Sequence, residues 1–268
     1  MKKWLKGLAL VTSVVALTAC GDEEASNKLV VGATAVPHAE ILEAAEPLLE
    51  EKGIELEVVV FTDYVTPNVA LRDGEIDANY FQTPGYLEGQ MKDYPDFDFV
   101  SVGAVHHEPL GLYSKEYSNL ADLPEGAEIL MSNSFSDHGR ILPIFEEAGL
   151  IKLKDGVGSS AVVEDIVENP KNLKFIYDIE AKMLPVAFEN DEADVVAINT
   201  NYALEGNIDI EKYGIAFEGQ DVVPANLIVV KEENKDAENI KTLVEVLRSE
   251  EIQQFIEEEY DGAVIFSK

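Results

Sequence analysis

Hydrophobic residues recur along the chain in two patterns, short apolar runs that are typical of buried strands and longer stretches at helical spacing. Residues 28–33 form a first run, and residues 54–61 form a second run with apolar side chains on one face. Between them, apolar positions three and four residues apart predict a helix that ends at Gly53. A strand, a helix and a strand in this order favour a parallel pair.

The alternation continues to the end of the chain and predicts an α/β fold. Further apolar runs predict strands at 76–81, 99–105, 110–114, 127–131, 173–176, 193–198 and 225–230. Stretches with helical spacing predict helices at 67–73, 137–148, 162–168, 184–189 and within 236–260.

Two alternating runs of elements are joined by proline-containing extended segments near 109–114 and 222–226. We therefore predict two lobes, each a mixed, mainly parallel sheet flanked by helices, with two crossover segments between them. The first lobe would comprise 29–110 plus 225–268, and the second 111–224. A cleft between two such lobes is where a small ligand would be enclosed.

The apolar pattern at the N-terminus is different. Three lysines precede an apolar run from Leu8 to Leu17, which is shorter than the about 20 residues that span a bilayer and is typical of a signal peptide. Small residues then lead to Cys20, the only cysteine in the chain. This order resembles the bacterial lipoprotein signal, in which the cysteine takes a diacylglycerol before cleavage. An ordinary signal peptide beside a chance cysteine is the alternative.

We therefore expect that residues 1–19 are removed and that lipid on Cys20, palmitate included, anchors the protein to the cell membrane. Two or more acyl chains hold a protein stably at a membrane, whereas one binds reversibly. Residues 20–28 are polar and lack apolar periodicity, so they predict a flexible tether. The working part of the protein would then be extracytoplasmic.

Charge narrows the set of partners. The net charge is −32, and loss of three lysines with the signal peptide would make it −35. Nucleic acid and anionic membrane surfaces would be repelled.

With no cysteine left in the folded part, its stability must come from packed cores rather than disulfides. We expect a soluble monomeric domain on its tether.

Arginine is scarce, and one arginine lies where a ligand carboxylate could bind. Arg72 and Arg248 have acidic neighbours that predict surface ion pairs. Arg140 follows Ser136 and Asp137, either of which can cap a helix, so we place it in the first helical turn. A guanidinium there can donate two parallel hydrogen bonds to a carboxylate. An ion pair with a nearby acid is an equally good interpretation.

Asparagines follow predicted strands at two places. Asn199 and Asn201 come directly after 193–198, and Asn226 follows Pro224 at the second crossover. Residues just past the carboxyl end of a strand commonly face the ligand crevice in α/β folds, and an asparagine carbonyl there could accept from an ammonium. Turn asparagines bonded to their own backbone are the alternative that the residues alone favour.

Aromatic residues gather in two predicted loops, where neighbouring glycines and prolines make them candidates for a pocket wall. They are Phe61, Tyr64, Tyr80, Phe81 and Tyr86.

The sequence His106-His107-Glu108 suggests a metal site as a minor alternative. Such a site would need a further ligand, for example His138, because adjacent histidines on an extended strand point to opposite faces. No nucleophile elbow, phosphate loop or HExxH motif occurs in the sequence, so we expect neither an enzyme nor a cofactor.

Six stretches carry a resemblance to a known family. Two of them are long and specific, Gly-Leu-Ile-Lys-Leu-Lys-Asp-Gly-Val-Gly and Asp-Ile-Val-Glu-Asn-Pro-Lys-Asn-Leu-Lys. On these motifs the chain resembles the NlpA-type methionine-binding lipoproteins of ABC importers. The resemblance implies a two-lobed, periplasmic-binding-protein-like fold and delivery of the ligand to a membrane permease driven by a cytoplasmic ATPase. The stretches are 31–42, 61–68, 73–79, 108–115, 149–158 and 165–174.

The resemblance also implies ligand-binding residues. The family's carboxylate-binding arginine corresponds to Arg140, which follows Gly139. Two family asparagines that hold the amino and carboxylate groups correspond to Asn199 and Asn226. The family's aromatic wall and a pocket histidine correspond to Tyr64, Phe81, Tyr86 and His106.

Departures from the family pattern concentrate near the ligand side chain. A second pocket histidine of the family is Thr83 here, and the loop 132–140, which includes Phe135, differs in sequence. Pro143 enters the following helix, where it removes a backbone hydrogen bond. We therefore expect an amino-acid ligand, methionine first, with a related amino acid or short peptide as the alternative.

Overall fold

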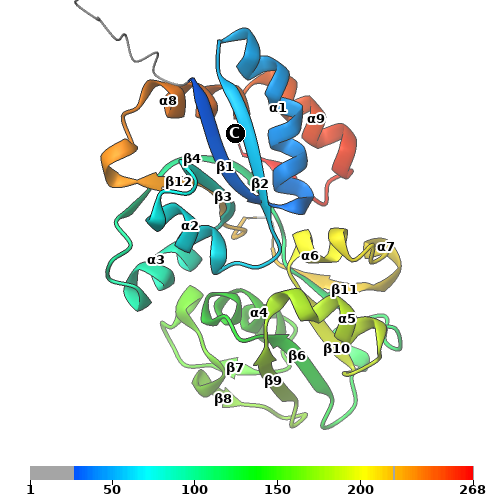
Figure 1. The fold of residues 1–268 in the computed structure, drawn as a ribbon. Coiled ribbons are helices and arrows are strands. Elements are labelled where there is room, and N and C mark those ends of the chain that lie inside the picture. The colour runs from blue at the N-terminus through cyan, green and yellow to red at the C-terminus, as the bar shows by residue number, and fades with distance from the viewer. Residues whose placement is uncertain (1–26, 220, 268) are drawn as a thin grey trace, which may run out of the picture.

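The computed structural model describes residues 27–267 except residue 220. The first and last parts of the chain, blue to cyan and orange to red, form one lobe, and the green and yellow middle forms the other (Figure 1). The signal peptide, Cys20 and most of the tether lie outside the described residues. No helix within the described residues is long and apolar enough to cross a membrane.

The first lobe is built on a six-stranded sheet in the order β13-β4-β12-β3-β1-β2. β1 pairs in parallel with β2 and β3, and the other three pairings are antiparallel. The strands are β1 Lys28–Thr34, β2 Glu55–Phe61, β3 Ala78–Gln82, β4 Phe99–His107, β12 Ala225–Lys231 and β13 Ile265–Phe266.

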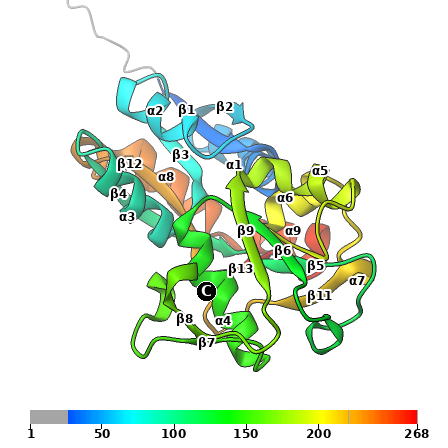
Figure 2. The same cartoon turned by 90° about the horizontal axis from the view of Figure 1, so that it is seen from below.

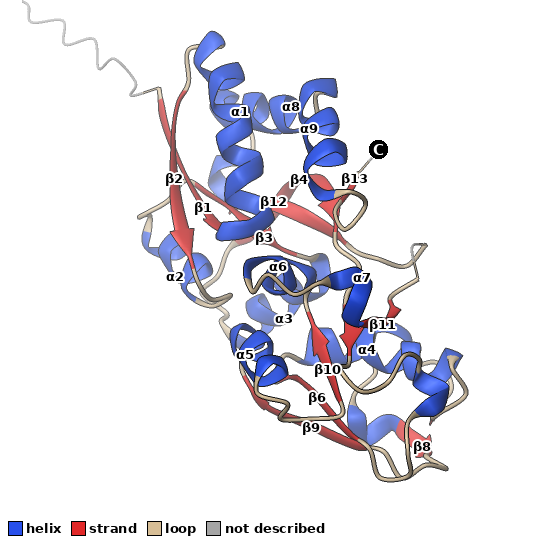
Figure 3. Ribbon diagram, turned by 90° about the vertical axis from the view of Figure 1, so that its right-hand side faces the viewer, coloured by secondary structure: helices blue, strands red, loops and turns tan. Residues whose placement is uncertain are grey.

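Helices cover both faces of this sheet, with α1, α8 and α9 on one side and α2 and α3 on the other (Figure 3). The central strand β12 has apolar residues on both faces. Ile228 and Val230 pack in the core beneath α1, α8 and α9, and Leu227 and Val229 pack in the core beneath α2 and α3. Alternate residues of a strand point to opposite faces. The helices are α1 Glu40–Glu51, α2 Thr66–Asp73, α3 Pro84–Asp93, α8 Glu238–Leu247 and α9 Glu250–Tyr260.

The second lobe contains a five-stranded sheet in the order β11-β5-β10-β6-β9 and a small hairpin of β7 and β8. α4 packs on one face of the larger sheet, and α5 and α6 pack on the other (Figure 2). The strands are β5 Gly111–Tyr113, β6 Glu128–Ser132, β7 Lys152–Leu153, β8 Ile166–Glu168, β9 Lys174–Ile179, β10 Val195–Ile198 and β11 Gly214–Phe217. The helices are α4 Phe135–Glu147, α5 Leu184–Glu189, α6 Thr200–Glu205 and α7 Ile210–Tyr213.

The predicted two-lobed α/β fold is confirmed, but the sheets are not mainly parallel. Each has two parallel pairs, alongside three antiparallel pairs in the first and two in the second. The crossovers explain this. β12 and β5 start at the waist between the lobes, whereas β1, β3, β6 and β10 end at the cleft, so the two groups must run in opposite directions.

The chain passes from the first sheet to the second between β4 and β5 and returns between β11 and β12. Both crossovers therefore lie at the proline-containing segments. The lobe boundaries at 110/111 and 224/225 stay a prediction.

Some predicted elements were wrong. The helix expected at 162–168 is a short 3-10 turn at Val163–Asp165 followed by β8, which pairs with β7. The tail 236–260 is two helices rather than one, because Ser249 caps the second by accepting from the backbone N–H of Ile252. The sequence interpretation also missed α3, α6, α7 and β11.

Candidate functional site

A pocket lies between the two lobes, with an empty volume of about 410 Å³ that is partly open to solvent. It is formed where strands end and helices begin: β3 leads into α3 from the first lobe, and β6 into α4 and β10 into α6 from the second. The lining residues are Tyr64, Phe81, Gln82, Thr83, Tyr86, Glu108, Asp137, Arg140, Asn199, Thr200, Asn201 and Asn226.

The structure brings seven of the eight predicted ligand-binding residues together in this lining. The exception is His106, which lies behind the pocket with its Nε2 hydrogen-bonded to Glu108. Glu108 and Asp137 line the pocket but were not predicted to do so. Glu108 belongs to the stretch 108–115 that carries the family resemblance, so this motif could have identified it as a candidate pocket residue.

The aromatic wall is centred on Tyr64, the only one of its three rings that lies in a loop. Its ring lies 6.0 Å from that of Phe81 and 5.8 Å from that of Tyr86, measured between centroids. Phe81 belongs to β3 and Tyr86 to α3, so the prediction that these aromatics lie in loops was wrong. Phe61 and Tyr80 pack with the core of the first lobe instead.

For Arg140, the ion pair that the sequence left open is present, whereas its role toward a ligand carboxylate stays a prediction. Arg140 lines the pocket, and it also forms a buried ion pair: its Nε and Nη2 donate to the Glu218 carboxylate, the shortest contact being 2.6 Å. Nη2 also donates to the backbone oxygen of Glu108 at 2.7 Å. Within the described part of the chain, Nη1 makes no hydrogen bond.

The helix around Arg140 starts earlier than predicted. α4 begins at Phe135, so Arg140 lies in the second turn rather than the first. The helix continues through Pro143 to Glu147. Gly139 is required by packing, because a Cβ at this position would lie 1.9 Å from the backbone oxygen of Ser159.

Two buried asparagines of the pocket lining each have one polar atom without a partner. Asn199 donates from Nδ2 to Asp137 at 3.3 Å, which leaves its Oδ1 buried without a partner. Asn201 accepts from the Tyr64 hydroxyl at 2.7 Å, which leaves its Nδ2 buried without a partner. The turn interpretation expected these side chains to bond to their own backbone, but they bond to the side chains of Asp137 and Tyr64 instead. Unpaired buried polar atoms are costly, and a ligand with matching groups would satisfy them.

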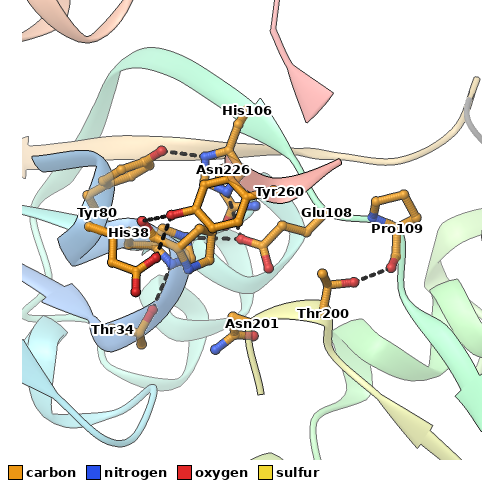
Figure 4. Close-up of polar contacts among 12 residues, drawn as sticks. Thr34, His38, Tyr80, His106, Glu108, Pro109, Thr200, Asn201, Asn226 and Tyr260 are labelled. Carbon is orange, nitrogen blue, oxygen red and sulfur yellow. Dashed lines mark hydrogen bonds and ion pairs between the residues drawn. The ribbon is translucent and has the colours of Figure 1, made fainter. Parts of the chain in front are cut away.

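Behind the pocket lies a buried polar cluster of His38, His106 and Glu108 (Figure 4). The Nε2 atoms of His106 and His38 lie 2.7 and 3.3 Å from the same Glu108 oxygen. Burial lowers the pKa of His38 to about 4 and that of His106 to about 3, so both imidazoles are neutral at pH 7. Burial also raises the pKa of Glu108, an effect that His38 and Arg140 oppose.

Comparison with known proteins identifies the family. The NlpA lipoprotein family matches residues 29–267. The chain belongs to this family. It is 46% identical over 271 residues to the methionine-binding lipoprotein MetQ of Bacillus subtilis, covering 99% of this chain and 98% of the relative. It is 39% identical over 259 residues to the D-methionine-binding lipoprotein MetQ of Escherichia coli K12, covering 96% and 94%.

Solved structures agree with this assignment. The chain superposes on the crystal structure of a lipoprotein from Bacillus subtilis with a TM-score of 0.89 at 46% identity, covering 91% of this chain and 99% of the other. It superposes on a nutrient-binding protein from Burkholderia cenocepacia bound to methionine with a TM-score of 0.84 at 38% identity, covering 90% and 100%.

The structure does not bring together the histidines of the metal alternative. His107 bonds through Nδ1 to the backbone oxygen of Val223, and His138 lies in α4 and bonds to Ser132. His38, His106 and Glu108 do converge. The Nε2 atoms of both histidines lie within hydrogen-bond distance of one Glu108 oxygen, so these three side chains form a hydrogen-bonded cluster.

Replacing Gly139 tests whether the close packing of α4 against the backbone of Ser159 requires a glycine. We expect Gly139→Ala to lower the free energy of unfolding by about 1–3 kcal/mol, because the added methyl meets backbone that cannot move freely. Gly89→Ala is the matched control in α3, where a Cβ meets nothing within 4 Å. Urea denaturation of both variants measures the difference, and equal stability of the two would contradict this account.

Proposed function

We propose that this NlpA lipoprotein is the extracytoplasmic, lipid-anchored solute-binding protein of an ABC importer and captures an amino acid, methionine first. The observation that carries the proposal is that one pocket contains Asn199, whose Oδ1 has no partner, and Arg140, whose Nη1 makes no hydrogen bond within the described residues. Asn199 is only 8% exposed. The asparagine oxygen can accept from an ammonium and the guanidinium can donate to a carboxylate, and a zwitterionic amino acid has both groups.

The polar end of the pocket has places for both charged groups of an amino acid. Arg140 and Asn226 face the ligand carboxylate, which accepts from both. The ligand ammonium, which only donates, lies between the Asn199 oxygen and the Glu108 carboxylate. Removing a zwitterion from water is costly unless its charges are paired and hydrogen-bonded. Here Glu108 would pair with the ammonium, and the Arg140 guanidinium would be shared between Glu218 and the ligand carboxylate.

The aromatic end of the pocket suits an apolar side chain. Tyr64, Phe81 and Tyr86 would cover the methionine thioether, and sulfur makes favourable contacts with ring edges. Because Thr83 replaces a family histidine, a related amino acid is the alternative ligand.

Ligand exchange would require the lobes to separate, because hydrogen bonds cross the cleft. The Tyr64 hydroxyl of the first lobe donates to Asn201 of the second, and the Tyr202 hydroxyl of the second donates to the backbone oxygen of Thr62 of the first. Closure of two lobes about crossover segments is a common mode of ligand capture. The protein would bind and release its ligand unchanged rather than catalyse a reaction, and it would need no cofactor.

The partners follow from this role. The protein would act as a monomer and deliver its ligand to a membrane permease that a cytoplasmic ATPase drives. Lipid on Cys20 would hold the protein at the cell membrane and raise its effective concentration near the permease. The relatives support this placement, since they are named lipoproteins.

Arg140→Ala tests the assignment of the ligand carboxylate. Truncating one partner of a buried charged hydrogen bond costs about 2–5 kcal/mol, so methionine affinity should fall about 30-fold or more. Calorimetry on the mature protein measures the dissociation constant. Arg72→Ala is the control, because Arg72 pairs at the surface with Asp73 and Asp96 and should leave affinity unchanged. Unchanged affinity in folded Arg140→Ala would refute the assignment.

The pH dependence of binding tests the role of Glu108. Its pKa is raised by burial, and an adjacent ammonium favours its ionised form, so methionine affinity should fall as pH falls through that pKa. The pKa values of His38 and His106 are about 4 and 3, below that of Glu108, so these two rings contribute little until the pH falls further. Calorimetry from neutral pH downward should show a steeper loss of affinity for the wild type than for Glu108→Gln. A shared slope would rule Glu108 out.

Cys20→Ala separates anchoring from binding. The substitution should release the protein from the membrane fraction while the dissociation constant for methionine stays the same, because Cys20 precedes the lobes by a tether. Fractionation and calorimetry give the two readouts. A change in affinity, or retention at the membrane, would show that the cysteine has another role.

A further inference from the structure

His38 contacts the ligand-binding residues without lining the pocket. It lies in the turn between β1 and α1, is 1% exposed, and makes three polar contacts (Figure 4). Its Nδ1 lies 2.7 Å from the Thr34 hydroxyl. Its Nε2 lies 3.1 Å from Oδ1 of Asn226 and 3.3 Å from the Glu108 carboxylate.

These contacts fix the position of the proton on His38. Burial lowers the pKa of His38 to about 4, so the ring is neutral at pH 7 and carries one N–H. The carboxylate of Glu108 only accepts hydrogen bonds, so the nitrogen that faces it must be the donor. The proton is therefore on Nε2, and Nδ1 accepts from the Thr34 hydroxyl.

The proton on Nε2 in turn sets the orientation of the Asn226 amide. The Nε2–H group of His38 donates to Oδ1 of Asn226. The Nδ2 group of the same amide therefore points away from His38. Asn226 lines the pocket and lies on β12, where its backbone is held opposite His106. The side chain therefore presents a hydrogen-bond donor to the ligand. Without His38 the amide could turn over and present its oxygen.

We propose that His38 is a positioning residue that makes the site select a carboxylate over a carboxamide at the acid end of the ligand. The inference rests on the proposed function, because it takes the ligand to be an amino acid. A carboxylate accepts from both Arg140 and the amide nitrogen of Asn226. A carboxamide turns an NH₂ group toward one of these two donors and forfeits that hydrogen bond.

The test compares methionine with methioninamide by calorimetry at one pH for the wild type, His38→Leu and His38→Gln. The ratio of the two dissociation constants measures selection for the carboxylate. We expect His38→Leu to reduce this ratio about tenfold or more, mainly through weaker methionine binding, as loss of a hydrogen bond to a charged group implies. His38→Gln should keep the ratio within about threefold, because its amide N–H can still donate to Asn226.

Tyr260→Phe is the control for general loosening of this region. The Tyr260 hydroxyl donates to Glu40 at 2.7 Å and to the backbone oxygen of Pro37 at 3.4 Å, and within the described residues it makes no hydrogen bond to Asn226, so its removal should leave the ratio unchanged. An equal loss of affinity for both ligands in His38→Leu would overturn the proposal and leave His38 a structural role. If the wild type binds no amino acid at all, the proposed function fails and this inference fails with it.

A measurement on the wild type keeps the test independent of whether His38→Leu folds. Nitrogen NMR of the histidine rings distinguishes the two neutral tautomers. His38 should carry its proton on Nε2 at pH 7. A proton on Nδ1, or a doubly protonated ring, would remove the basis for the Asn226 orientation and overturn the proposal.

Discussion

The ion pair between Arg140 and Glu218 is the interaction on which the rest of the site depends. A buried guanidinium is tolerated only when its charge and its N–H groups are satisfied. Glu218 lies just after β11 on the second crossover, and the backbone oxygen of Glu108 lies just after β4 on the first, so Arg140 ties α4 of the second lobe to both. A ligand that binds the remaining edge of Arg140 is thereby coupled to the segments about which the lobes would move.

Neighbouring side chains determine which atom of each asparagine remains for a ligand. Asp137 in the pocket lining accepts from the nitrogen of Asn199, which leaves the Asn199 oxygen unpaired, while His38 behind the pocket binds the oxygen of Asn226, which leaves the Asn226 nitrogen for a ligand. The pocket therefore contains one asparagine that accepts and one that donates, although the two side chains are chemically identical. In the proposed mode of binding, this difference would set the orientation of the zwitterion, and it depends on Asp137 and His38 as well as on the asparagines themselves.

The sequence predicted the elements that repeat a simple pattern and the residues that carry a family motif. It could not predict Glu218 as the partner of Arg140 or His38 as the partner of Asn226, which lie 78 and 188 residues away. No local pattern encodes such separations. The apolar run at 162–168 was misassigned because a short run fits a strand or a helix equally well, and only its pairing with β7 decides between them.

A crystal structure of the mature protein with L-methionine tests the central claim most directly, because that claim concerns the direction in which a zwitterion lies between the lobes. We predict the ligand carboxylate within hydrogen-bond distance of Arg140 and the Asn226 nitrogen, the ammonium beside the Asn199 oxygen and Glu108, and the side chain against Tyr64. A ligand bound in the reverse orientation, or outside this cleft, would contradict the account.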